Sequence, residues 1–202
     1  MTDLALEDLD RLYRKPHPLV VAKTLPKLDP HCRAFIGLST FCVISTADSE
    51  GRQDVSPRGG EPGFVHVVDD ATLLMPDRGG NNRLDNLRNL LGGSGRIGMM
   101  FVIPGLNDVL RVNGRGAVVE DETLAEDFME FGKPPKALVR IDVEEAFLHC
   151  PKAFMRGGLW EPENWPDRSS LATASEMFSD QLGLPKPTAT PEQVEANYRT
   201  QL

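Results

Sequence analysis

The segment 78–83 (RGGNNR) combines two arginines and two glycines directly before a stretch of leucines. Leucines at positions 84, 87 and 91 recur at helical spacing and predict a helix over residues 83–91, which Gly92 and Gly93 end. The first turn of a helix has unpaired backbone N–H groups, and these attract anions. One interpretation is that Arg78, Arg83 and the helix start bind a phosphate group together.

Two asparagines, Asn81 and Asn82, are candidate caps of this helix, and the glycine pair before them lets the loop approach a ligand closely. The alternative is that Asn82 merely caps a surface helix while both arginines are solvated. The residues of this segment alone favour neither interpretation. A second basic position is Arg58, in the segment 54–60 (DVSPRGG), where a predicted strand ends.

Six short segments with β-branched, aromatic or alternating apolar residues must position these loops. They are residues 39–46, 53–56, 71–75, 96–103, 109–119 and 137–143. Few long helices separate them, which favours an antiparallel barrel over repeated βαβ units. In the segment 109–119, Gly114 and Gly116 share the apolar face, and this indicates close backbone approach or strong bending. After residue 144 we expect helical and irregular structure.

The length of 202 residues suits one well-buried core. We expect a helical segment over residues 1–38 that packs on the barrel, the barrel over residues 39–160, and a helical extension over residues 161–202.

Composition narrows the class of protein. The net charge of -8, with no run of basic residues, argues against a nucleic-acid partner. No apolar run approaches the roughly 20 residues of a spanning helix, and the N-terminus does not resemble a secretory signal, so we expect a cytoplasmic protein without a membrane partner. Three cysteines with no CxxC pair argue against a disulfide framework and against a metal site.

The order of these segments resembles one known superfamily. The loop 54–60, the strand 72–76, the loop 77–83, the leucine helix and the segment 110–116 (LRVNGRG) are similar in order to the FMN-binding split barrels of the pyridoxamine 5'-phosphate oxidase-like superfamily. The similarity covers roughly residues 30–160. It looks closest to a branch of FMN-dependent enzymes of unknown substrate, with motifs like D-x-S-P-R-G, P-D-x-x-G-N-N-R and H-C-P-K-A. The resemblance implies a mainly β fold with peripheral helices, built on a six-stranded antiparallel split β-barrel that binds FMN.

The resemblance also implies roles for single residues. Arg58 occupies the place of a basic residue that meets the flavin phosphate, and Asn81, Asn82 and Arg83 stand where the family brings a serine and basic residues to that phosphate. Arg111 lies on a strand that runs past the flavin in the family. Pyridoxamine phosphate oxidases themselves end in a tryptophan-containing strand and an Arg-x-His clamp. The C-terminus of this chain (EQVEANYRTQL) has neither, so oxidation of vitamin B6 is not expected.

Other chemical groups follow the last predicted strand. Trp160 could stack on an isoalloxazine ring, and Arg156 could reach its carbonyl oxygens or an anionic substrate. The alternative is a core tryptophan beside a surface arginine. His149 and Cys150 are adjacent in the chain and have no visible partner for a triad, so we do not expect a Cys/His nucleophile, although the histidine could approach a flavin.

These expectations combine into an FMN-dependent oxidoreductase that acts on an unidentified small molecule. In the superfamily the flavin sits between two barrels, so the resemblance implies a homodimer in which Arg156 and Trp160 reach the partner's flavin. The main alternative is a non-catalytic binder of flavin, deazaflavin or haem, and a third is a barrel that has lost its cofactor. Haem would need an axial ligand, which four scattered histidines do not identify.

Overall fold

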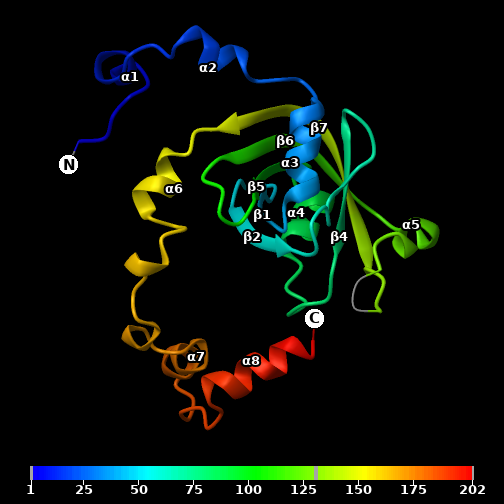
Figure 1. Cartoon of the computed structure of the whole chain (residues 1–202), viewed down its shortest axis with the longest axis vertical. Helices are drawn as coiled ribbons and strands as arrows, with labels where there is room; N and C mark the ends of the chain where they lie inside the picture. Colours follow the sequence, from blue (N-terminus) through cyan, green and yellow to red (C-terminus); the bar gives the residue numbers. More distant parts are fainter. Residues whose placement is uncertain (1, 130–131, 202) are drawn as a thin grey trace.

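The protein is built on one curved antiparallel sheet of seven strands, seen in a computed structural model that describes residues 2–129 and 132–201 (Figure 1). The strands lie in the order β2-β1-β5-β6-β7-β4-β3. Their bounds are β1 Phe41–Ala47, β2 Gln53–Gly59, β3 His66–Val67, β4 Thr72–Asp77, β5 Arg96–Val102, β6 Val109–Val119 and β7 Ala137–His149. The fold is the mainly antiparallel split barrel with peripheral helices that the sequence predicts.

Each of the six predicted strands is present, and three details differ from the prediction. β2 continues through Pro57 to Gly59. Proline has no backbone N–H, and β2 tolerates this because it is an edge strand with one side unpaired. β7 continues to His149, so the expectation of helical structure directly after residue 144 is wrong. The extra strand β3 has two residues, too few for a period-2 pattern to mark.

The core lies on one face of the sheet. Cys42, Ile44 and Thr46 of β1 alternate with partly exposed neighbours and are all at most 2% exposed. The register of β6 and β7 shifts between Asn113 and Gly114, where a β-bulge bends the pair. A Cβ atom at Gly114 would lie 2.2 Å from the carbonyl oxygen of Asp142, so the predicted close backbone approach is confirmed.

Two helices cover the core side of the sheet. α3 (Pro30–Leu38) begins at Asp29, whose side chain accepts a hydrogen bond from the Cys32 N–H, and it buries Cys32 and Ile36. α4 (Asp85–Gly92) contacts β1, β2 and β6 and buries Asn86 and Leu90. The remaining helices are α1 (Asp8–Leu12), α2 (Pro18–Ala22), α5 (Glu122–Glu126), α6 (Lys152–Gly157), α7 (Ala174–Leu182) and α8 (Pro191–Arg199), with short 3-10 turns at Pro162–Asn164 and Arg168–Ser170.

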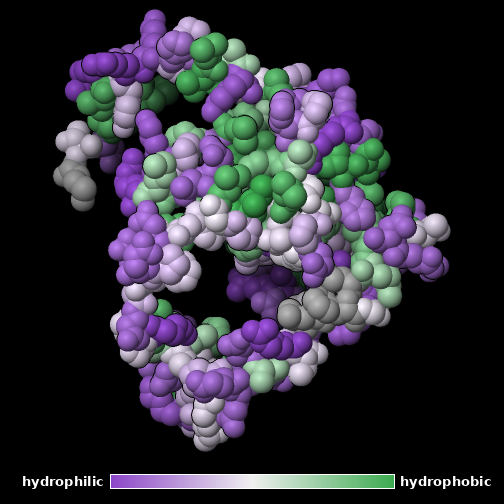
Figure 2. Space-filling view, in the orientation of Figure 1, coloured by the Kyte–Doolittle hydropathy of each residue, from purple (hydrophilic) through white to green (hydrophobic). Residues whose placement is uncertain are grey.

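The helices at the two ends of the chain lie outside the barrel (Figure 1). α1 and α2 bury none of their residues, and at the other end capping boxes at Thr173 and Thr190 start α7 and α8. Figure 2 shows an opening between the barrel and these C-terminal helices. Within the described part of the chain, no helix combines the length and the apolar character needed to cross a membrane.

Candidate functional site

A cavity of about 270 Å³ lies where the ends of β2 and β4 meet the loop before α4. Five of the predicted site residues line it, namely Arg58, Arg78, Asn81, Asn82 and Arg83. Its other lining residues are Ser56, Pro57, Gly59, Phe64, Pro76, Asp77, Gly79, Gly80, Leu84 and Lys136. The two basic loops, about twenty positions apart in the sequence, therefore line one cavity.

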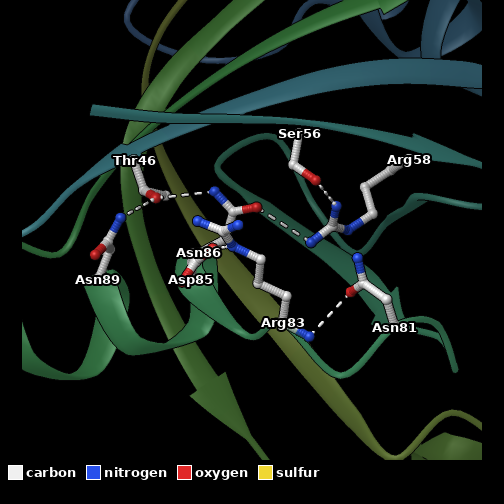
Figure 3. A network of polar contacts seen from close by, with 8 residues as sticks. All are labelled: Thr46, Ser56, Arg58, Asn81, Arg83, Asp85, Asn86 and Asn89. Carbon is white, nitrogen blue, oxygen red and sulfur yellow. Dashed lines mark hydrogen bonds and ion pairs between the residues drawn. The ribbon is translucent and has the colours of Figure 1, made fainter. Parts of the chain in front are cut away.

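Arg58 is held in this cavity by three hydrogen bonds. It points from β2 toward the start of α4, and its guanidinium donates to Ser56 Oγ at 2.6 Å, to the carbonyl oxygen of Pro57 at 2.8 Å and to Asn86 Oδ1 at 3.2 Å (Figure 3). All three acceptors are neutral. Among the ion pairs of the described residues none includes Arg58, so its charge is available to an anion.

The start of α4 and the hydrogen bonds of the loop before it differ from the prediction. The helix begins at Asp85, two residues later than predicted, and its N-cap position is Leu84, which has no side-chain cap bond. Asn81 Oδ1 instead accepts from the backbone N–H of Arg83 at 2.9 Å, which closes a turn in the loop. Asn82 adopts a left-handed backbone conformation with φ 56°, which asparagine tolerates better than most residues. The prediction that these asparagines cap the helix is wrong.

The later start also changes the face that α4 buries. The sequence predicts Leu84, Leu87 and Leu91 as the apolar face, but Leu84 and Leu91 are exposed. Leu87 and Leu90 pack on the core instead, beside the buried amide of Asn86. Gly92 and Gly93 end the helix as predicted.

Two further arginines reach the cavity from the loop. Arg83 pairs with Asp85 at 2.5 Å and is 78% exposed, and this hydrogen bond raises the pKa of its guanidinium. Arg78 is half-buried and donates to the carbonyl oxygen of Phe128 at 2.9 Å. Gly79 and Gly80 lie between them, with no atom within 4 Å of where a Cβ would be, so the backbone between the two arginines is open to a ligand.

The sequence did not predict two charged residues of the cavity, Asp77 and Lys136. Asp77 ends β4, and burial raises the pKa of its carboxyl, an effect that the charges of Arg58 and Lys136 partly offset. Lys136 lies directly before β7, and its backbone N–H donates to the Asp77 carbonyl oxygen. Only the pairing of β4 with β7 brings Lys136 here, and no local pattern marks that contact. The cavity thus contains four cations and one carboxylate.

The other predicted site residues lie elsewhere in this chain. Arg111 is on the opposite face of the sheet, stacked 5.0 Å over the Phe147 ring, and it lines a separate hollow with Gln53 and Asn113. Arg156 is exposed on α6. Trp160 is half-buried and donates from Nε1 to the carbonyl oxygen of Leu106 at 2.9 Å. None of these three residues is part of the cavity at Arg58.

This donor set suits a phosphate group. Guanidinium and ammonium groups are the usual partners of phosphate oxygens, and here they come from β2, the loop before α4 and the start of β7. The start of α4 adds partial positive charge at the same edge. The volume of about 270 Å³ is slightly below the roughly 300 to 1,000 Å³ of small-molecule sites, so it fits the phosphate end of a cofactor and leaves a larger ring system outside.

One family model matches the chain. The family model described as pyridoxamine 5'-phosphate oxidase matches residues 28–150, more than half of the chain. The chain belongs to the pyridoxamine 5'-phosphate oxidase family. The match includes both basic loops, and in this family member the segments 1–27 and 151–202, with Arg156 and Trp160, lie outside it.

Solved structures are similar to this pyridoxamine 5'-phosphate oxidase family member at low identity. HupZ of Group A Streptococcus is 18% identical, with 60% of this chain and 93% of that chain covered and a TM-score of 0.47. An FMN-binding protein from Syntrophomonas wolfei is 13% identical, with coverages of 72% and 97% and a TM-score of 0.45. An FAD-binding protein from Mycobacterium smegmatis is 17% identical, with coverages of 61% and 96% and a TM-score of 0.42. No curated protein matches the chain.

Proposed function

We propose that the protein binds FMN by its phosphate in the cavity at Arg58 and acts as an FMN-dependent oxidoreductase on a small molecule. The observation that supports this most is the convergence of Arg58, Arg78, Arg83 and Lys136 on one cavity from three separate segments of a split barrel. The loop backbone at Asn81 and Asn82 completes the phosphate site in this proposal.

The protein's own residues have a limited task under this proposal. FMN, when bound, supplies the redox chemistry, and the protein supplies binding, orientation and electrostatics. No side chain of the cavity needs to act as a strong acid or base, because hydride transfer depends above all on alignment of the reacting atoms. Arg58 and its neighbours fix one end of the cofactor and thereby set the direction in which its ring leaves the cavity.

A homodimer is part of the proposal, with the flavin between two barrels. The outer face of the sheet supports it, because the register aligns Val43, Met100, Arg111 and Phe147 across β1, β5, β6 and β7, and none of the four is fully buried. Beside them, Phe41 and Val55 are 37% and 64% exposed. A second copy that covers this face would remove apolar area from water. Arg111, Arg156 and Trp160, which lie outside the cavity at Arg58, then become candidates for contact with the flavin ring.

The visible spectrum of the purified protein tests the cofactor. Flavin bands, and release of FMN on denaturation, are the expected result. A deazaflavin spectrum would mean that the phosphate site holds a deazaflavin in place of FMN. A Soret band would indicate haem. A colourless protein that does not take up added FMN would contradict the proposal.

A further inference from the structure

Arg58 is held by a buried polar network behind the cavity. Asn86 is 4% exposed, and Thr46 on β1 is 2% exposed. Asn86 Nδ2 donates to Thr46 Oγ1 at 2.9 Å, and Asn89 Nδ2 donates to the same oxygen at 3.0 Å. Figure 3 shows Asn86 between Thr46 and the Arg58 guanidinium. The network therefore connects β1, α4 and β2 through side chains alone.

The chemistry of the partners fixes which way the Asn86 amide points. A guanidinium only donates hydrogen bonds, so the Asn86 atom that faces Arg58 must be the carbonyl oxygen. The amino end then faces Thr46, whose hydroxyl oxygen can accept. Because both ends of the amide are occupied in a buried place, the side chain has one favourable orientation and holds Arg58 in one direction.

We infer that Asn86 is a positioning residue that directs the Arg58 guanidinium at the phosphate of the ligand without neutralising it. The inference rests on the proposed function. An aspartate at this position would hold Arg58 equally well but would form an ion pair with it, as Asp85 does with Arg83. A leucine would leave the guanidinium without a partner on that side. Only a neutral acceptor at position 86 both orients the Arg58 guanidinium and leaves its positive charge unpaired.

The substitution N86D tests this inference most sharply. The fold should tolerate it, because the Thr46 hydroxyl can donate to the new carboxylate while it still accepts from Asn89. We expect N86D to weaken FMN binding about tenfold or more, since the Arg58 charge is then shared, and to leave riboflavin binding unchanged. N86S, whose shorter side chain withdraws the acceptor from Arg58 without adding charge, should weaken FMN binding by a smaller factor.

Two controls separate positioning from folding. N89S removes a hydrogen bond to the same Thr46 oxygen and does not alter the contacts of Arg58. The ratio of FMN affinity to riboflavin affinity should therefore equal that of the wild type. In the double variant R58A/N86S, the second substitution should add no further loss of FMN affinity, because the residue through which Asn86 acts is gone. Thermal unfolding of each variant reports whether the barrel remains folded.

The outcomes distinguish this inference from the function on which it rests. If R58A weakens FMN binding but N86D and N86S both bind FMN like the wild type, the positioning role is wrong and the phosphate site stands. If N86D lowers FMN and riboflavin affinity equally, or if N86S lowers FMN affinity further in the R58A background, Asn86 is a structural residue. If R58A itself binds FMN normally, the proposed function and the inference are both overturned.

Discussion

At the scale of single residues, burial and pairing divide groups that look equivalent in the sequence. Arg58 and Arg83 have the same side chain and line the same cavity. Arg58 is bound to neutral acceptors, whereas Arg83 is mostly exposed and shares its charge with Asp85. We therefore expect Arg58 to contribute more to anion binding than Arg83.

The three cysteines should differ in reactivity for the same reason. Burial raises the pKa of the Cys42 thiol to about 12, and burial also raises the pKa of Cys32, while Cys150 is exposed. Because the thiolate is the reactive form, the native protein at pH 8 should react with an aromatic disulfide reagent at one thiol, and the denatured protein at three. Cys150→Ser should abolish the native reaction. Fast labelling of Cys42 in the native protein would contradict the burial of β1.

Asp77 should oppose both ligand binding and stability at neutral pH. Its pKa in the folded state is raised by burial, so its contribution to stability is present below the unfolded value near 3.9 and is lost as pH rises through the folded value. Asp77→Asn should therefore gain thermal stability relative to the wild type between about pH 4 and pH 7. At pH 8 it should also bind FMN more tightly, since a carboxylate no longer faces the phosphate dianion. Weaker FMN binding by this variant would show that Asp77 donates or accepts within the site.

At the scale of elements, the sequence predicts the type of each strand better than the details of the site. Alternation marks β1 and β5, because each has one face in the core, and a short apolar run marks β4, which is buried on both faces. The start of α4 and its buried face were predicted wrongly, because a buried asparagine at position 86 does not register as part of an apolar pattern. Asp77 and Lys136 join the site only through strand pairing, and a pairing between distant segments leaves no local signal.

The bulge in β6 offers a test of packing at this scale. A Cβ at Gly114 would collide with the Asp142 carbonyl oxygen, whereas a Cβ at Gly92, the last residue of α4, would have no atom within 4 Å. Gly114→Ala should lower the free energy of unfolding by about 1 to 3 kcal/mol, and the matched control Gly92→Ala should leave it equal or slightly higher. Urea denaturation of the two variants measures both. Equal stability of Gly114→Ala and the wild type would mean that the bulge is absent.

At the scale of the whole molecule, the outer sheet face and the extended ends are the parts that a single chain leaves exposed. We expect a homodimer by light scattering coupled to size-exclusion chromatography. Val55→Asp places a charge on that outer face, and Val55 is 64% exposed in the single chain, so the variant should fold and become monomeric. Leu91→Asp, at a position on α4 that is 72% exposed, is the matched control and should remain dimeric. A wild-type monomer that binds FMN stoichiometrically would contradict the dimer.

The central claim is that the cavity at Arg58 holds the phosphate of FMN, and paired titrations with FMN and riboflavin test it directly. Each charge-assisted hydrogen bond to the dianion is worth about 1.5 to 3 kcal/mol, so Arg58→Ala should weaken FMN binding roughly tenfold to a hundredfold. Riboflavin has no phosphate, and its affinity should change little. Arg83→Ala should show the same contrast with a smaller loss. Normal FMN binding by Arg58→Ala, or an equal loss of riboflavin, would contradict the account.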